Sequence, residues 1–328
     1  MLDVIVVGDL IVDDVIRINA LPKPEGVELA RDFKRLAGGA ANFAIMASRL
    51  GLKVKVIDSV GTDEPGKFLV DILLQEGIET SAIKIKKGVT KQTLVIVSSK
   101  GEKSFIGLIV EDTATITPED IEEELIQRAS SIYVSGYSIG VRELFPTEGK
   151  AVLKSIEVAE QLGKTIFFDP GPLVGLIDEE CLYRVIKRST ILSLNLEEAS
   201  LITHASSLEE NIAILHRLGP KLVAIKMGEN GCLLSSPGTF YREPGLNVNV
   251  VDPTGAGDAF NAAILFGFLK NMPLSLIAKL ANAIGALSVT KLGAGQNLPT
   301  RSEISSLLSK LGEEHLLLLL EQYWKTLI

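Results

Sequence analysis

The chain has 328 residues, of which 46% are hydrophobic and 23% charged, and its formal net charge is -8. These values are ordinary for a globular protein with a substantial core, and a chain of this length can form one large α/β unit. The acidic balance argues against a general nucleic-acid binder, which meets phosphates with a basic surface. The longest markedly apolar run, at 316–320, is far shorter than the roughly 20 residues of a membrane span. We therefore expect neither a nucleic-acid partner nor a membrane.

Cysteines and histidines are few and give no site. Cys181 and Cys232 lie far apart and lack metal-ligand spacing, so we expect two buried free thiols in a reducing compartment. The histidines are scattered, which argues against a zinc site and against a histidine-based triad. The first residues lack the basic segment of a signal peptide and have the pattern of a strand. We expect a cytoplasmic protein.

Short apolar runs alternate with helical segments along the chain. Helices are expected at 40–50 and 67–76, and each is followed by a glycine suited to a helix C-terminus. Continuous apolar strands separated by helices indicate a parallel sheet covered on both faces. The strands expected in this sheet lie at 4–7, 54–59, 131–134, 165–168, 189–194 and 222–226.

Two regions, 12–36 and 83–110, interrupt this rhythm. The second holds short strands at 83–86, 93–98 and 104–109, with a turn at Lys100-Gly101. These strands are too closely spaced for crossover helices, so we predict a small antiparallel β sheet inserted as a lid into a single domain that spans 1–328. The alternative is a pair of surface hairpins with no role in ligand binding.

The sharpest motif is Asp252-Pro253-Thr254-Gly255-Ala256-Gly257-Asp258-Ala259-Phe260. A strand-like run at 246–251 precedes it and a helical segment at 259–269 follows it. The glycines thus stand at a helix N-terminus, where free backbone N–H groups and the helix dipole attract an anion. Asp258 would repel a phosphate, and it fits this place if it faces an acceptor hydroxyl. The simpler alternative is an aspartate that caps the helix.

This motif resembles the second signature of the PfkB, or ribokinase-like, family of carbohydrate kinases. Segments 36–51, 60–66, 195–198 and 226–231 resemble further motifs of the family in the same order. The resemblance covers nearly the whole chain. It implies a ribokinase-like three-layer α/β/α sandwich with a mostly parallel sheet, and transfer of the γ-phosphate of ATP to a primary hydroxyl of a small sugar. In one departure, the first glycine of the family's Gly-Gly pair falls on Ala37, so the pair lies at Gly38 and Gly39.

The resemblance also assigns the catalytic roles. Asp258 is the general base, which takes the proton of the acceptor hydroxyl. The amides of Gly255, Ala256, Gly257 and Asp258 form an anion hole for the transferring phosphoryl group. Members of the family often bind a monovalent cation beside this hole, and Asp252 and Thr254 stand at matching places. The expected cofactors are ATP and Mg²⁺, with K⁺ as a further hypothesis.

Other residues are assigned to the nucleotide. Asn195 and Glu198 have i, i+3 spacing, which suits Mg²⁺ held through water, and a helix capping box is the alternative. Lys226, Gly228 and Gly231 follow a strand and would let ATP approach the backbone, unless they form only a tight turn. By resemblance, Asn282 lies near the adenine.

The acceptor site is expected at the end of the first strand. Asp13 can accept two hydrogen bonds from a vicinal diol, and Asp9 and Asp14 are near enough in sequence to share this role. Gly38, Gly39 and Asn42 would complete a polar wall.

The identity of the acceptor stays open at this stage. The segment 169–172 lacks the Asn and Arg by which family members read an acidic sugar, and Gly39 stands where the ribokinase pattern has a lysine. Neutral sugars and nucleosides remain, and Phe33 and Phe105 in the predicted lid could provide an aromatic wall for a base. A catalytically silent ligand-binding relative is a further alternative. A dinucleotide enzyme is disfavoured, because no Gly-x-Gly-x-x-Gly follows the first strand. Exposed lid strands also predict a homodimer.

Overall fold

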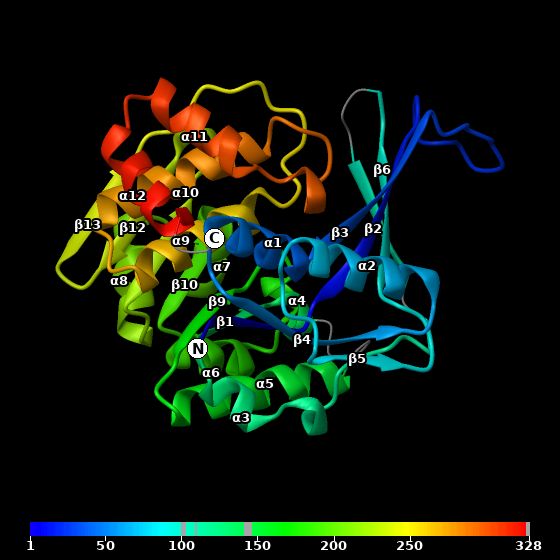
Figure 1. Cartoon of the computed structure of the whole chain (residues 1–328), viewed down its shortest axis with the longest axis horizontal. Coiled ribbons are helices and arrows are strands. Elements are labelled where there is room, and N and C mark those ends of the chain that lie inside the picture. Colours follow the sequence, from blue (N-terminus) through cyan, green and yellow to red (C-terminus); the bar gives the residue numbers. More distant parts are fainter. Residues whose placement is uncertain (100–102, 109, 141–145, 326–328) are drawn as a thin grey trace.

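The computed structural model describes residues 1–99, 103–108, 110–140 and 146–325. At its centre lies a nine-stranded sheet in the order β13-β12-β11-β10-β9-β8-β1-β4-β5 (Figure 1). Neighbours from β11 to β5 are parallel, whereas β12 and β13 add an antiparallel edge. The mostly parallel sheet is confirmed. Its strands are β1 (Leu2–Val7), β4 (Val54–Gly61), β5 (Ile83–Lys86), β8 (Ala129–Ser135), β9 (Thr165–Asp169), β10 (Ile191–Asn195), β11 (Leu222–Lys226), β12 (Cys232–Ser236) and β13 (Thr239–Glu243).

Helices cover both faces of this sheet, because alternate residues of each strand point to opposite sides. In β1, Val4 and Val6 join one core cluster, and Ile5 and Val7 join the other. The first layer, above the sheet in Figure 1, contains α1 (Ala40–Leu50), α2 (Glu64–Gln75), α9 (Ala256–Leu269), α10 (Leu274–Ser288), α11 (Arg301–Lys310) and α12 (Glu314–Lys325). The second contains α3 (Glu123–Gln127), α4 (Tyr137–Gly140), α5 (Pro146–Gln161), α6 (Glu179–Arg188), α7 (Leu196–Thr203) and α8 (Leu208–Leu218).

Helix α9 is the most deeply buried element of the first layer. Every residue from 259 to 267 is buried, and such a helix, apolar all round, belongs to a core. It packs against α1 and α10. The motif at its N-terminus is therefore carried by a rigid support.

A second, smaller sheet projects from the body (Figure 1). Its order is β3-β2-β6-β7, and its strands are β2 (Leu10–Arg17), β3 (Asp32–Gly39), β6 (Gln92–Val97) and β7 (Lys103–Leu108). The pairs β2–β3 and β6–β7 are antiparallel, and the central pair β2–β6, which joins these two hairpins, is parallel. The small inserted sheet is thus confirmed, with one parallel pair at its centre, and its role as a lid stays a prediction. The turn predicted at Lys100-Gly101 lies outside the described residues.

The assignment of 83–86 to the lid was wrong. This segment is β5, which pairs in parallel with β4 at the edge of the large sheet. Helix α2 lies between the two strands in sequence and supplies the crossover that a parallel pair needs. The spacing argument compared β5 only with the strands after it and overlooked the helix before it.

The strand expected at 246–251 does not form either. This segment has no strand geometry, and Leu246, Val248 and Val250 instead line a cavity. Its apolar pattern thus reflects a cavity wall. Within the described ranges, no helix is long and apolar enough to cross a membrane. Both cysteines are free and buried, as expected.

Candidate active site

The loop before α9 presents backbone N–H groups. Gly255 is the N-cap of α9 with φ of 72°, a left-handed conformation that favours glycine. A Cβ there would lie 2.4 Å from Cβ of Ala294. The amide of Ala256 donates to the carbonyl of Pro253 at 3.2 Å. In the described part of the chain, the amides of Gly255, Gly257 and Asp258 find no hydrogen-bond acceptor. Three of the four predicted anion-hole amides are therefore free.

The carboxylate of Asp258 does not cap α9. It accepts hydrogen bonds from Nδ2 of Asn42 at 3.3 Å and from the hydroxyl of Tyr133 at 3.4 Å, and no side chain caps the start of α9. The helix-cap interpretation is therefore wrong. Burial, followed by repulsion from Asp169, raises the pKa of Asp258 to about 7, against the opposing effects of Lys226 and the two hydrogen bonds. A carboxylate with such a pKa suits proton acceptance near neutral pH.

Asn42 and Tyr133 hold Asp258 in place from two different elements. Asn42, on α1, also accepts a hydrogen bond from the amide of Gly295 at 2.8 Å. Tyr133, on β8, is buried and stacks on Phe43 with ring centroids 3.6 Å apart. The sequence analysis missed Tyr133. The available signal was a tyrosine within a buried strand, since a buried hydroxyl needs a partner.

The residues predicted to hold the acceptor include Asp13 and Gly38, which lie on β2 and β3. Asp13 accepts no hydrogen bond from the described residues, and a Cβ on Gly38 would lie 2.2 Å from its Oδ2. Only a glycine leaves room at that point. Burial, together with the charges of Asp258, Asp14 and Asp252, raises the pKa of Asp13 to about 7. The structure thus brings Asp13 and Gly38 together, and neither carboxylate oxygen of Asp13 is used by a hydrogen bond from the described residues.

Two neighbouring aspartates differ in their availability. Asp14 forms a bidentate pair with Arg35, at 2.7 and 2.9 Å, so it is not free to share the role of Asp13. Asp9 has φ of 62°, and its carbonyl accepts the amide of Ala40 at 2.8 Å. Burial raises the pKa of its carboxyl well above the usual value, although Lys91 opposes this. Gly39 is fixed by the same turn, because a Cβ there would lie 2.1 Å from the carbonyl oxygen of Asp9.

A cavity of about 610 Å³ lies on the other side of the anion hole. It is lined by four residues predicted to bind the nucleotide and by two of the anion hole, namely Lys226, Gly228, Gly231, Asn282, Ala256 and Gly257. Segments far apart in sequence thus meet at one pocket of the size that small-molecule ligands occupy. Asn282 donates to the carbonyl of Pro244 at 2.7 Å, so it also holds the cavity wall.

Asn195 and Glu198 lie outside this lining and form a capping box. Oδ1 of Asn195 accepts the amide of Glu198 at 2.8 Å, and Oε2 of Glu198 accepts the amide of Asn195 at 2.7 Å. The alternative interpretation, a helix capping box, is therefore confirmed. Burial raises the pKa of Glu198, and Lys226 opposes the rise. Oε1 of Glu198 makes no hydrogen bond to the described residues, which leaves one oxygen for a water or a metal.

An acidic network under the anion hole was missed by the sequence analysis. Asp169, at the end of β9, accepts hydrogen bonds from the ammonium of Lys226 at 3.0 Å, from the amide of Gly171 at 2.9 Å and from the side chain of Asn261. Lys226 lines the cavity of about 610 Å³ and therefore stands between it and the carboxylates of Asp169 and Asp258. Asp169 entered the sequence analysis only as part of a possible acceptor motif.

Asp252 and Thr254 are engaged by a lysine. The ammonium of Lys103, on lid strand β7, contacts Oδ1 of Asp252 and lies 3.0 Å from Oγ1 of Thr254. Asp252 also accepts the amides of Thr254 and Gly293, each at 2.8 Å. Burial alone would raise the pKa of Asp252, but these interactions outweigh it and lower the pKa. No sequence pattern pointed to Lys103.

Phe33 and Phe105 do not form a common wall. Strand register places Phe33 in a row with Ile16 and Ile96, whereas Phe105 shares a row with Val15 and Val95. Adjacent rows point to opposite faces of a sheet. Phe105 therefore lies on the same face as Asp13, and Phe33 lies on the outer face.

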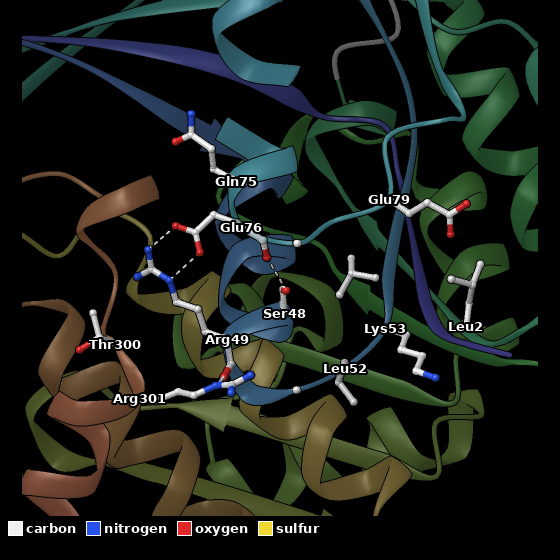
Figure 2. A pocket seen from close by; sticks show the side chains of 13 residues that line it. Leu2, Ser48, Arg49, Leu52, Lys53, Gln75, Glu76, Glu79, Thr300 and Arg301 are labelled. Atoms are coloured by element: carbon white, nitrogen blue, oxygen red, sulfur yellow. Dashed lines mark hydrogen bonds and ion pairs between the residues drawn. The ribbon is translucent and has the colours of Figure 1, made fainter. Parts of the chain in front are cut away.

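A second cavity, of about 700 Å³, lies at the far end of α1 (Figure 2). It contains none of the predicted site residues. Figure 2 shows Arg49 directed at Glu76, with Nε to Oε2 at 2.9 Å, and the same guanidinium also donates to the carbonyls of Leu298 and Gln296. The charge of Arg49 is therefore used within the fold.

Comparisons with known proteins agree with this geometry. A sequence model of the "pfkB family carbohydrate kinase" matches residues 1–301. Fructokinase-1 of Zea mays is 31% identical over 312 residues, which cover 89% of this chain and 95% of that protein. A structure of Arabidopsis thaliana ribokinase with ribose and ATP has a TM-score of 0.76 at 24% identity, covering 94% of this chain and 98% of that one. A structure from E. coli with ATP and Mg²⁺ has a TM-score of 0.80 at 24% identity, covering 94% and 100%.

These likenesses confirm the expected fold, with its large sheet and its small lid. The family match extends from β1 through the anion-hole loop to the start of α11. It therefore includes every element that carries a predicted site residue. The chain belongs to the pfkB family of carbohydrate kinases, which are phosphotransferases acting on sugar hydroxyls.

Proposed function

We propose that this kinase transfers the γ-phosphate of ATP to a primary hydroxyl of a neutral sugar, with Asp258 as the general base. The observation that carries the proposal is the position of Asp258. Its carboxylate lies at the free amides of the α9 N-terminus, and its charge acts on the open carboxylate of Asp13. An acceptor held by Asp13 would thus meet both the base and the anion hole.

The charge of the acceptor side supports a neutral substrate. Asp9, Asp13 and Asp258 all have raised pKa values, and burial is the largest cause for each of them. Repulsion among carboxylates contributes to each rise in pKa. For Asp13, no lysine or arginine among the described residues opposes the rise. A carboxylate or phosphate on the acceptor would add another negative charge to this group. Hydroxyl groups, by contrast, donate hydrogen bonds to carboxylates.

The chain's own residues then account for the steps of the transfer. The acceptor oxygen bonds to the γ-phosphorus, the bond from that phosphorus to the β–γ bridging oxygen breaks, and Asp258 accepts the hydroxyl proton. Asn42 and Tyr133 orient the carboxylate. The free amides of Gly255, Gly257 and Asp258 would hold the oxygens of the transferring group. ADP, the product, would then leave from the cavity in which we propose that ATP binds.

Mg²⁺ fits this site through few protein ligands. No group of three or more His, Cys, Asp or Glu side chains suited to a metal occurs in the described ranges, and Mg²⁺ bound with a nucleotide usually keeps several waters. Oε1 of Glu198, which makes no hydrogen bond to the described residues, is the group we assign to it, through water. When bound, the ion would neutralise charge on the phosphates.

A nucleoside is the second candidate acceptor. Phe105 is 60% exposed and lies on the same lid face as Asp13. A base could stack on its ring while the ribose hydroxyls reach Asp13. The same geometry leaves room for a relative that binds ligands without catalysis, and turnover decides between these candidates.

We also propose that the protein forms a homodimer through the lid and works in the cytoplasm. The outer lid face carries an apolar row that includes Phe33, Ile16 and Ile96, and Phe33 is 57% exposed. Two such faces, or two lid edges, would protect each other from water. The free cysteines fit a reducing compartment. Light scattering tests the dimer, and a monomeric mass at working concentration would contradict it.

The function is tested by ADP release with Mg-ATP and a panel of hexoses, pentoses, inositols, keto-deoxy acids and nucleosides. We expect turnover with a neutral hexose or pentose and background rates with the acids. A preference for nucleosides would support the second candidate. The absence of turnover across the whole panel would contradict a kinase function toward these acceptors.

A further inference from the structure

Lys103 makes a contact across the molecule that the proposed mechanism does not use. It lies on β7, the edge strand of the lid, in a row that faces the same way as Asp13. Its ammonium contacts Asp252 and lies 3.0 Å from Oγ1 of Thr254. The two partners of this ion pair are 149 residues apart in sequence. The lid is thus joined to the loop that leads into α9.

Asp252 requires a positive partner because it is only 1% exposed. Its oxygens accept the amides of Thr254 and Gly293, but these groups carry no full charge. Lys103 is the cationic side chain that pairs with it in the described part of the chain. Removing the cation that pairs with a buried carboxylate strongly destabilises the folded protein. Because the Lys103 side chain is 14% exposed, bulk salt screens the pair only weakly.

The pair also lies at the point where it can position the anion hole. Gly255 follows Thr254 directly, and its amide is one of the three free donors. The turn whose Gly293 amide binds Asp252 continues to Gly295, whose amide binds Asn42, a partner of Asp258. Loss of the Lys103 charge that pairs with Asp252 would therefore disturb both the free amides and the general base Asp258.

We propose that Lys103 is a tethered cation, whose ammonium fills the place of a monovalent metal ion at Asp252 and Thr254 and fastens the lid to the anion-hole loop. Lys103 is then a positioning residue. It follows that the native protein needs no K⁺, which replaces the K⁺ hypothesis for these two residues. The catalytic part of this inference rests on the proposed function, whereas the cation site itself does not.

Thermal unfolding tests the cation site without any turnover. The variant Lys103→Met removes the charge and keeps most of the apolar stem, and Lys34→Met is the matched control, an exposed lysine on the same lid face. Each protein is melted in potassium chloride and in tetramethylammonium chloride at equal ionic strength. We expect equal Tm values in the two salts for the native protein and for the control. Lys103→Met should melt lower in tetramethylammonium and recover part of the loss in potassium.

A second variant separates charge from packing. In Lys103→Met combined with Asp252→Asn, neither charge of the pair remains, so the response of Tm to potassium should disappear. The proposal is overturned if the Tm of Lys103→Met is the same in potassium chloride and in tetramethylammonium chloride. It is also overturned if potassium raises the Tm of the native protein, since a metal ion and not the lysine would then occupy the site.

Kinetics add the catalytic part. In tetramethylammonium, Lys103→Met should lose about tenfold or more in kcat, with little change in the KM of the acceptor, because anion-hole donors act on the transition state. Potassium should restore part of kcat. An unchanged kcat in tetramethylammonium would contradict a positioning role. If the native protein turns over no acceptor, the proposed function fails, and the melting comparison still decides the cation site.

Discussion

The proposed donor half and the proposed acceptor half of this site are built in different ways. The donor half uses the backbone: free amides at the start of α9 and glycines that line a cavity of about 610 Å³. The acceptor half uses side chains that converge from β2, α1 and β8, among them Asp13, Asn42 and Tyr133. Backbone amides bind any phosphate, whereas converging side chains can be exchanged one by one. We therefore propose that the loop determines how the donor is bound and that the side chains determine which acceptor is chosen.

The strongest test of this division is Asp258, where the halves meet. We expect Asp258→Asn to lower kcat by about 10²–10⁴-fold, because the general base is lost. ATP should bind with nearly unchanged affinity, since the free amides and the cavity lining remain. Steady-state rates and calorimetric titration with ATP measure the two quantities. A loss of ATP affinity equal to the loss of rate would contradict the division.

Breaking the donor half alone requires a change in the backbone. Gly255→Ala places a Cβ 2.4 Å from Cβ of Ala294 at a positive φ, which should displace the anion-hole amides and lower kcat by roughly 10²-fold. Gly238→Ala is the matched control. Gly238 also has positive φ, of 83°, but a methyl group added there would have no atom within 4 Å. Equal effects of the two variants on kcat would show that backbone strain, and not the anion hole, is responsible.

The acceptor half should respond separately. At a pH above about 7, where Asp13 is ionised, we expect Asp13→Ala to raise the KM of the acceptor about 10- to 100-fold, because hydrogen bonds from hydroxyls to a charged carboxylate are lost. The KM of ATP should stay nearly unchanged. Asp14→Ala is a useful control, since Asp14 is held by Arg35 and should affect the acceptor much less. A large rise in the KM of ATP with Asp13→Ala would contradict separate halves.

The smallest expected effect is a shift in pH dependence. The pKa of Asp258 is about 7, and a base works only when deprotonated, so kcat/KM should fall as pH drops through about 7 and level off above it. Asp169 raises this pKa, while Lys226 lowers it. Asp169→Asn should therefore move the acidic limb to lower pH. A limb that stays in place or moves to higher pH would argue against Asp258 as the titrating group.

The same contrast explains what could be predicted from sequence. The anion-hole motif is contiguous, and its glycines report their backbone geometry directly, so the loop and the start of α9 could be placed from the sequence. The role of this loop in binding the donor stays a prediction. Tyr133 was missed because its partner Asp258 is 125 residues away, and Lys103 because Asp252 is 149 residues away. No local pattern encodes such a meeting.

The errors in the predicted fold have a related origin. The apolar pattern at 246–251 is shared by a strand and by the wall of a cavity, and only tertiary packing distinguishes the two. The strand β5 was placed in the lid because its partner β4 lies before α2 in the chain. Helix α1, whose bounds were predicted correctly, depends on local composition and on the glycine that ends it.

The central claim is most directly tested by ³¹P NMR of the native protein incubated with Mg-ATP and, in separate samples, fructose and ribose. The account predicts that ATP signals are replaced by those of ADP and of a new phosphomonoester coupled to the protons of a primary carbon, with no such product from Asp258→Asn. ADP with inorganic phosphate alone, or a sugar phosphate formed equally by Asp258→Asn, would contradict it.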